Sequence, residues 1–336
     1  MSRRRLAAGF TALLLSACAT TPLQAPGPTS SMARLPGWDA EDHAAAFAAV
    51  RQACAAEPGA HRSGVCAEAL AHGRLGEDAA RSFLERHFRA EPIEGDGLLT
   101  GYFSPSYEAR RTPEGDFTAP LRPAPADPGA SPDRQTIERT PAPDALAWMR
   151  PEDLFFLQVQ GSGVLTFPDG TRRRAAFAGS NGQTFVAIAK TMVAEGLLAP
   201  AAASAGHVHD WLAAHRGPEA RAVMDLDPRY IFFRLAPDDG GEPQGASGAP
   251  LIAGRSLAVD PAHHPYFELL WVDARDGALS GARPSYQRLA IALDRGGAIL
   301  GQVRADLFVG SGPRAGDEAA RIRHTLRLYR IVPAQP

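Results

Sequence analysis

The sequence predicts a mainly β fold with peripheral helices, and three observations support this class. Short apolar or alternating segments, typical of strands, recur from residue 98 to the C-terminus between Gly and Pro clusters. Residues 164–167 and 171–177 flank Pro168-Asp169-Gly170, a turn signal that predicts a β-hairpin. Helical spacing of apolar residues is limited to a few segments in the first two thirds of the chain.

Five segments have the composition and spacing of helices. Residues 39–54 carry two carboxylates in the expected first turn, where they stabilise the helix dipole, and residues 76–88 repeat apolar side chains at helical spacing. Residues 183–195 are followed by Gly196, a common residue after a helix C-terminus. Shorter helices are predicted over residues 208–215 and 218–224.

Strands are predicted where apolar or alternating residues are bounded by Gly, Pro or Asp. The last of them, residues 323–332, alternates without Gly or Pro until Pro333. The complete set covers residues 98–103, 154–160, 164–167, 171–177, 229–235, 256–260, 266–272, 289–293, 307–309 and 323–332. The proline-rich residues 112–143 are expected to form a long irregular excursion.

Composition limits the classes of function. The 336 residues are 45% hydrophobic and 21% charged, which is enough for two domains with a substantial core. The net charge of −2 gives no reason to expect a nucleic-acid partner, because phosphate binding usually requires a strongly basic balance.

The first 34 residues predict export and lipid anchoring. Basic residues 3–5 and the apolar residues 6–15 form a signal peptide, residues 1–17, whose apolar run is too short to span a bilayer. Residues 15–18, Leu-Ser-Ala-Cys, resemble a bacterial lipobox, so Cys18 is the expected lipidated N-terminus. Residue 19 is not the aspartate of an inner-membrane retention signal, which favours the periplasmic face of the outer membrane. Residues 18–34 are expected to be a disordered tether.

Two further cysteines, Cys54 and Cys66, complete the set of three. In an oxidising compartment they are expected to form a disulfide, and two buried thiols are the alternative. Neither cysteine has a catalytic histidine at a recognisable spacing, so a cysteine nucleophile is not expected.

Polar side chains on two predicted strands are candidates for binding a sugar. Thr100 and Tyr102 share one face of residues 98–103, where they could hydrogen-bond to and stack on a ring, although an ordinary exposed strand would look the same. Beside the glycine pair Gly161 and Gly163, three residues of one parity would line a face of a cleft: Gln158, Gln160 and Ser162.

Asn181 precedes the predicted helix 183–195, either as a cap or as a substrate contact.

Histidines at 207 and 209 and the pair at 263 and 264 lack a Cys or Asp partner at a diagnostic spacing, so no metal site is expected.

Three aspartates stand at predicted strand ends in the last quarter of the chain: Asp260, Asp294 and Asp306. An acid among apolar neighbours, such as the residues 307–309 beside Asp306, has its charged form disfavoured, which raises its pKa. A general acid needs this property. The alternative is that these are turn and cap aspartates hydrogen-bonded to nearby amides.

The order of these motifs resembles the membrane-bound lytic murein transglycosylase A family. The three aspartates lie in LAVDP, ALDRGGAI and ADLFVGSGP, as in the three-aspartate domain of that family. Residues 98–110, 154–170, 177–185 and 245–251 resemble its other motifs in the same order. The sequence departs from the family in the loop at residues 261–265, and residues 133–143 are a poorer match from which no role is transferred.

The resemblance implies a double-psi β-barrel domain formed by residues 35–103 and 236–336, with the three-aspartate region at 254–332. A second β domain, residues 104–235, would be inserted, with a glycan groove between the two. Asp306 matches the catalytic aspartate, and Asp294 and Asp260 match a supporting pair. Together with the residue patterns above, the expected substrate-binding residues are Thr100, Tyr102, Gln158, Gln160, Ser162, Gly163 and Asn181.

The implied activity is that of a peptidoglycan lytic exotransglycosylase without a cofactor. Asp306 would act as acid and then as base to cleave the MurNAc–GlcNAc bond, forming 1,6-anhydromuramyl products. The alternatives are a hydrolase in which Asp294 activates water, and a non-catalytic peptidoglycan-binding lipoprotein. The expected partners are glycan strands, the outer membrane through Cys18, and murein synthases or scaffolds.

Overall fold

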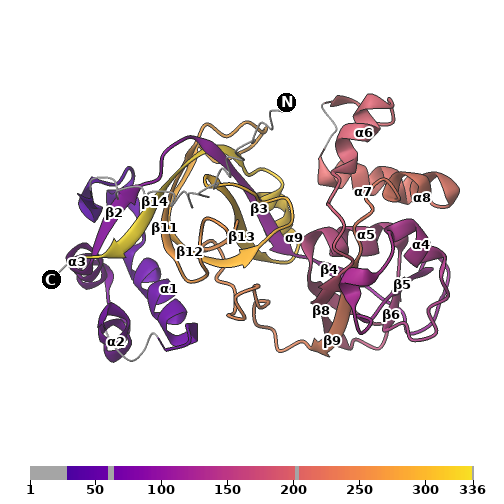
Figure 1. The fold of residues 1–336 in the computed structure, drawn as a ribbon, viewed down its shortest axis with the longest axis horizontal. Coiled ribbons are helices and arrows are strands. Elements are labelled where there is room, and N and C mark those ends of the chain that lie inside the picture. The colour runs from indigo at the N-terminus through magenta and orange to yellow at the C-terminus, as the bar shows by residue number, and fades with distance from the viewer. Residues whose placement is uncertain (1–28, 60–63, 201–203, 335–336) are drawn as a thin grey trace, which may run out of the picture.

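The computed structural model describes residues 29–59, 64–200 and 204–334, so the signal peptide, Cys18 and most of the tether lie outside the described residues. Two lobes lie side by side in Figure 1, one built around a β-barrel and the other around a smaller sheet. Among the described residues, no helix combines the length and apolar character needed to cross a membrane.

Six strands close the barrel in the order β14-β11-β12-β10-β13-β3, with β3 pairing back onto β14. Two of these pairs are parallel, β10 with β12 and β13 with β3. The strands are β3 (Gly97–Ser104), β10 (Ser256–Val259), β11 (Leu269–Arg275), β12 (Ser285–Arg295), β13 (Arg304–Ser311) and β14 (Arg323–Pro333). The sheet continues from β14 into β2 (Phe88–Pro92) and β1 (Ser30–Ser31).

Alternating apolar residues of these strands fill the barrel interior, as the period of a strand requires. Leu307 of β13, Leu257 of β10 and Leu99 of β3 are fully buried in one cluster. Because β3 precedes the second lobe in the chain and the other barrel strands follow it, the barrel closes only when distant parts of the chain meet. The short α9 (Pro313–Ala319) packs against β3 and β13.

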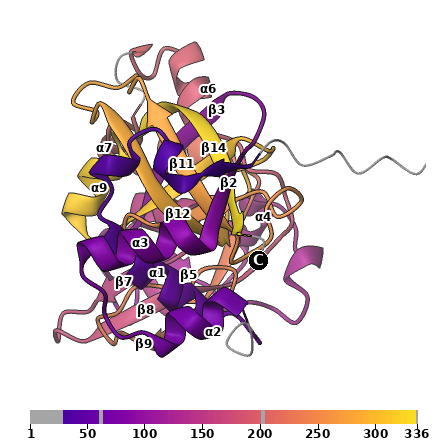
Figure 2. The ribbon, with the colours of Figure 1, turned by 90° about the vertical axis from the view of Figure 1, so that its left-hand side faces the viewer.

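Three helices cover the outer side of the barrel, as Figure 2 shows. They are α1 (His43–Ala56), α2 (Gly64–Ala71) and α3 (Glu77–His87), preceded by the 3-10 turns η1 (Met32–Arg34) and η2 (Trp38–Ala40). A buried ion pair ties this layer to the barrel, because the Arg255 guanidinium donates to the Glu41 carboxylate at 2.9 Å. The same carboxylate accepts from the backbone N–H of Leu289 at 2.6 Å.

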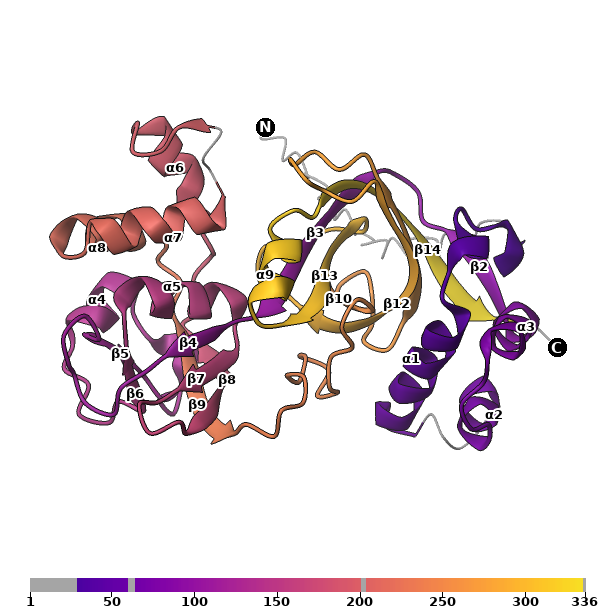
Figure 3. The ribbon, with the colours of Figure 1, turned by 180° about the vertical axis from the view of Figure 1, so that it is seen from behind.

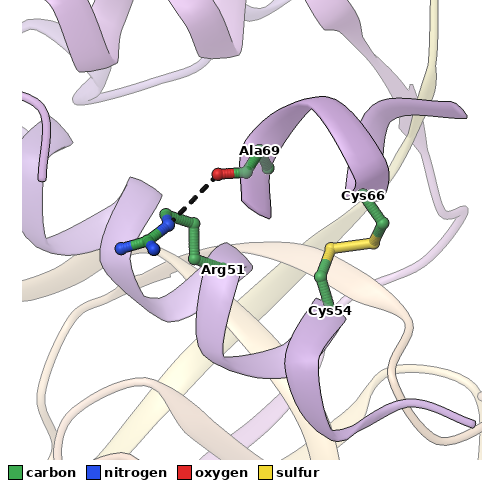
Figure 4. The surroundings of a disulfide bond; sticks show 4 residues. All are labelled: Arg51, Cys54, Cys66 and Ala69. Carbon is green, nitrogen blue, oxygen red and sulfur yellow. Dashed lines mark hydrogen bonds between the residues drawn. A yellow bond between two sulfur atoms is a disulfide. The ribbon is translucent and has the colours of Figure 1, made fainter. Parts of the chain in front are cut away.

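Cys54 of α1 and Cys66 of α2 form a disulfide in the structure, with their Cα atoms 5.3 Å apart (Figure 4). Arg51 supports the same junction, since its Nε donates to the carbonyl of Ala69 at 3.1 Å. The structure therefore shows the disulfide that was expected for an oxidising compartment, and not two separate buried thiols.

The second lobe contains a four-stranded sheet in the order β4-β7-β8-β9 and a two-stranded sheet of β5 and β6, visible from behind in Figure 3. Its strands are β4 (Ser106–Glu108), β5 (Ala119–Leu121), β6 (Ala147–Met149), β7 (Gly163–Thr166), β8 (Arg172–Ser180) and β9 (Ile231–Pro237). Its helices are η4 (Pro128–Ala130), α4 (Arg134–Arg139), α5 (Pro151–Gln160), α6 (Ile188–Ala194), α7 (Ala205–Ala214) and α8 (Pro218–Met224).

The predicted fold class is confirmed, and the β7–β8 hairpin forms as expected. The strand predicted over residues 154–160 is wrong, because these residues form α5. Pro151 begins that helix, two carboxylates occupy its first turn, and Gly161 ends it with φ of 82°. A short apolar run flanked in this way fits a helix as well as a buried strand.

Two other expectations need correction. The helix predicted over residues 183–195 is only α6, which begins at Ile188. Residues 112–143 are not wholly irregular, since they contain β5, η4 and α4.

Candidate active site

A cleft of about 660 Å³ lies between the barrel and the second lobe. The barrel wall comes from β3, β10, β13, the end of β12 and the turn that follows β12. The facing wall comes from the C-terminal end of α5, from β8, from residues 182–185 and from Arg229 and Ile231. Asp306 and Asp294 both line this cleft.

Asp306 is the third residue of β13, where its neighbours are set by strand pairing on both sides. It is opposite Thr100 of the parallel strand β3 and opposite Ala258 of the antiparallel strand β10. The Thr100 hydroxyl donates to Asp306 Oδ1 at 2.6 Å. Burial raises the pKa of Asp306 to about 6, against the lowering effects of Thr100 and Arg304, and the negative charge of Asp294 adds to the increase.

Asp294 lies near the end of β12 and is held by three donors. The hydroxyl of Tyr102 donates to Oδ2 at 2.9 Å, and the backbone N–H groups of Ala246 and Arg295 both donate to Oδ1 at 2.9 Å. Burial raises the pKa of Asp294, although all three hydrogen bonds oppose this increase. Within the described residues the structure shows no direct hydrogen bond between Asp294 and Asp306, so the two carboxylates interact by charge.

Asp260, the third aspartate, holds the turn that follows β12. Its carboxylate accepts from the backbone N–H of Ala262 at 3.0 Å and of Gly301 at 2.8 Å. These bonds, first that from Gly301, lower the pKa of Asp260. Asp260 lies outside the lining of the cleft. The turn that it holds presents Leu300, 68% exposed, to the cleft.

Thr100 and Tyr102 were expected to share one face of a strand, and β3 places both beside the aspartates. Their hydroxyls are used as donors to Asp306 and Asp294. Both residues therefore support the acids directly, and Tyr102 also lines the cleft.

The glutamines were assigned to a common strand face, and the helical geometry of α5 separates them. Gln158 is buried, with its Oε1 accepting from Arg134 and its Nε2 donating to the carbonyl of Ile231 at 3.5 Å. Gln160, at the last position of α5, accepts from the backbone N–H of Phe103 at 3.4 Å and lines the cleft.

The other three predicted binding residues either lie outside the lining of the cleft or are packed and hydrogen-bonded within the protein. Ser162 lies outside the lining of the cleft. Gly163 is packed so closely that a Cβ there would lie 2.7 Å from a methyl of Leu157. Asn181 is buried, and its amide donates to the carbonyls of Pro132 at 2.8 Å and Pro228 at 2.9 Å.

Histidines in two places have carboxylate partners. His209 Nε2 lies 2.8 Å from Asp153, beside Glu152, but both carboxylates are already paired with Arg150 or Arg216. These residues form a salt-bridge network in which both carboxylates already have cationic partners. His264 is buried between Glu268, at 2.6 Å, and the carbonyl of Gln302, at 2.8 Å.

Several residues of the cleft were not identified from the sequence: Phe177, Phe185, Arg229, Leu300 and Arg304. Arg304 had a usable signal, because a residue two positions before Asp306 on a strand has its side chain on the same face. Phe177 and Phe185 lie at the two ends of the motif 177–185, but nothing in that motif singled out the aromatic residues. Arg229 and Leu300 had no signal, since they reach the cleft from separate elements.

Residues 98–234 match the family model described as the MltA specific insert domain, and residues 255–332 match the 3D domain. The membrane-bound lytic murein transglycosylase A of Vibrio cholerae is 33% identical over 247 residues, covering 71% of this chain and 66% of that protein. The chain thus spans just under two thirds of the length of that curated relative.

Two solved structures are similar over nearly the whole chain. A membrane-bound lytic murein transglycosylase from Agrobacterium tumefaciens has a TM-score of 0.79 and 30% identity, covering 91% of this chain and 97% of that one. The structure of E. coli MltA with bound chitohexaose has a TM-score of 0.72 and 26% identity, covering 93% of each chain. By its domains, sequence and fold, this chain belongs to the membrane-bound lytic murein transglycosylase A family.

Proposed function

We propose that this protein is a peptidoglycan lytic transglycosylase that cleaves the bond between MurNAc and GlcNAc and leaves 1,6-anhydromuramyl ends. The observation that carries the proposal is an aspartate with a pKa raised to about 6 in a cleft of about 660 Å³. That volume is within the range of small-ligand sites. The relative crystallised with chitohexaose supports a chain of sugars as the ligand.

The reaction needs one group that first gives and then takes a proton. Protonated Asp306 transfers its proton to the bridging oxygen as the bond from the muramyl C1 to that oxygen breaks. The C6 hydroxyl of the same muramyl residue then bonds to C1 and gives its proton to the Asp306 carboxylate. The acid is regenerated and no water is consumed, so a pKa near 6 serves both half-reactions near neutral pH.

Asp294 is a supporting residue in this proposal, and its contacts argue against a role as the base of a hydrolase. Oδ1 accepts two backbone N–H groups and Oδ2 accepts the Tyr102 hydroxyl. A carboxylate held in this way is poorly placed to take a proton from water. Its negative charge instead raises the pKa of Asp306, while Asp260 positions the turn beside the cleft.

The substrate would be held mainly by the second lobe. Phe177 is 48% exposed on β8 and offers an aromatic face to a sugar ring, and Gln160 contributes an amide. Arg229 lies on the same wall and can donate to hydroxyl or carboxylate groups of the glycan.

We further propose the cellular setting that the sequence predicts. Lipidated Cys18 would hold the protein at the periplasmic face of the outer membrane. The tether was expected to run to residue 34, but residues 30–34 form β1 and η1 and Met32 is buried in the core, so only the part of the tether before residue 30 would let the enzyme reach the glycan. The barrel domain would comprise residues 35–103 and 236–336, with residues 104–235 inserted. Murein synthases or scaffolds remain the expected protein partners, and exolytic action the expected mode.

Mass spectrometry of muropeptides released from purified sacculi tests the activity. The wild type should release anhydro-muropeptides, and Asp306→Asn should release none while still binding sacculi. Reducing ends, which are one water heavier, would instead identify a hydrolase. Binding without any release by the wild type would identify a non-catalytic peptidoglycan-binding protein.

A further inference from the structure

Arg304 contacts the catalytic site through Thr100. Its Nη2 donates to Thr100 Oγ1 at 2.9 Å, and that hydroxyl lies 2.6 Å from Asp306 Oδ1. The guanidinium is held in place, because its Nη1 also donates to the carbonyls of Leu98 at 3.2 Å and Ala305 at 2.6 Å. Arg304 therefore occupies a fixed position beside the proposed acid without bonding to it directly.

Hydrogen-bond direction in this chain of three groups is determined by chemistry. A guanidinium has only donors, so Thr100 must be the acceptor from Arg304. The hydroxyl has one hydrogen to give, and among the described residues its acceptor is Asp306 Oδ1. An oxygen that accepts this hydrogen is a poor position for the carboxyl proton, whereas Oδ2 accepts no hydrogen bond from the residues that the structure describes and can carry the proton.

We propose that Arg304 is a positioning residue which, by orienting the Thr100 hydroxyl, keeps Oδ1 of Asp306 unprotonated and leaves Oδ2 as the oxygen that exchanges the proton with substrate. This inference rests on the proposed function. The same Oδ2 gives its proton to the bridging oxygen and later takes one from the C6 hydroxyl, so the acid never needs to rotate. A fixed proton position is a form of preorganisation.

Other charged groups near Asp306 are accounted for. Asp294 on β12 raises its pKa, while Thr100 on β3 and Arg304 on its own strand lower it. On β14, Arg323 is opposite Thr100. Burial lowers the pKa of Arg304, and the charge of Arg323 adds to this effect. The β10 neighbour of Asp306, Ala258, carries no charge.

The test compares pH profiles of kcat/KM for anhydro-muropeptide release from sacculi. The wild-type rate should fall above pH about 6, where Asp306 loses its proton. Arg304→Gln should move this fall to higher pH by on the order of one unit, since a nearby cation is removed. It should also lower kcat roughly tenfold, a part of what general acid–base catalysis supplies. Arg304→Lys, which keeps a charged donor, should recover most of both effects.

A double-mutant comparison separates a role through Thr100 from a structural role. Thr100→Val should shift the profile in the same direction, and Arg304→Gln added to it should have little further effect on kcat. Arg111→Gln is the matched control, because Arg111 is an exposed arginine that pairs with Asp169 outside the lining of the cleft and acts on neither Asp306 nor Asp294, so the profile should not change.

An unchanged profile in Arg304→Gln, or additive losses of kcat in the double variant, would overturn the inference while the wild type still makes anhydro products. Failure of the wild type to make them would overturn the proposed function itself. If Arg304→Gln does not fold, Arg304→Met, which also removes the donors to Thr100, is compared in the wild-type protein and in the Thr100→Val variant. An equal loss of kcat in both backgrounds contradicts action through Thr100.

Discussion

Because its pKa is raised, Asp306 should lower the free energy of unfolding of the protein when it is ionised. An aspartate whose folded pKa is about 6, against an ordinary value of 3.8, binds its proton more tightly in the folded than in the unfolded protein. The folded state is therefore favoured by Asp306 at low pH, and this advantage is lost as the pH rises from about 4 to about 6. Replacing Asp306 by Asn removes the dependence.

The magnitude follows from the size of the shift. A difference of about two pKa units, at 1.36 kcal/mol per unit, corresponds to as much as about 3 kcal/mol. Asp306→Asn should therefore raise the free energy of unfolding by up to about 3 kcal/mol at pH 7.5 and change it little at pH 4. Urea denaturation of the wild type and the variant at both pH values measures this difference.

The matched control is Asp260→Asn, for which the opposite sign is expected at pH 7.5. Its folded pKa is lowered by the backbone N–H groups of Gly301 and Ala262, so its charged form stabilises the fold above its ordinary pKa. If Asp306→Asn were neutral or destabilising at pH 7.5 with an unchanged slope of the denaturation curve, the reasoning from burial of Asp306 would be refuted.

Three further predictions concern other parts of the structure. Tyr102→Phe removes a donor from Asp294, so the pKa of Asp294 should rise and less negative charge should face Asp306. The pKa of Asp306 should then fall, and the loss of kcat/KM with rising pH should begin at lower pH. An unchanged pH profile of kcat/KM contradicts this. Glu41→Gln leaves the buried Arg255 without its charge partner and should cost about 3–5 kcal/mol in urea denaturation, whereas loss of an exposed carboxylate should cost little. Reducing the disulfide between α1 and α2 should lower the free energy of unfolding by about 3 kcal/mol, because a loop of 12 residues is released, and an unchanged denaturation midpoint would show that the helices alone hold this layer.

Much of the fold was accessible from local patterns. The β7–β8 hairpin was predicted because its turn residues and flanking strands act over a short stretch of chain. The segment of α5 was not, since a run of apolar residues buried on most sides lacks the periodicity that separates a helix from a strand. That error also misplaced Gln158, which the helix turns into the interior.

For the site, the order of the motifs along the chain led to Asp306 and Asp294 without any coordinates. What it could not supply was the set of partners for those acids. Thr100 is 206 residues from Asp306 in the chain, and they meet only because β3 and β13 pair in parallel with this register.

The sequence by itself predicted an export signal and a candidate acid, and it determined the family motifs and the mainly β class, because each depends on residues that are close together in the chain. Only the tertiary structure decided that Asp306 is buried enough to hold a proton near neutral pH, that three donors hold Asp294, and that Arg304 contacts Thr100. Burial and hydrogen-bond direction depend on which distant strands become neighbours, and barrel closure makes that choice.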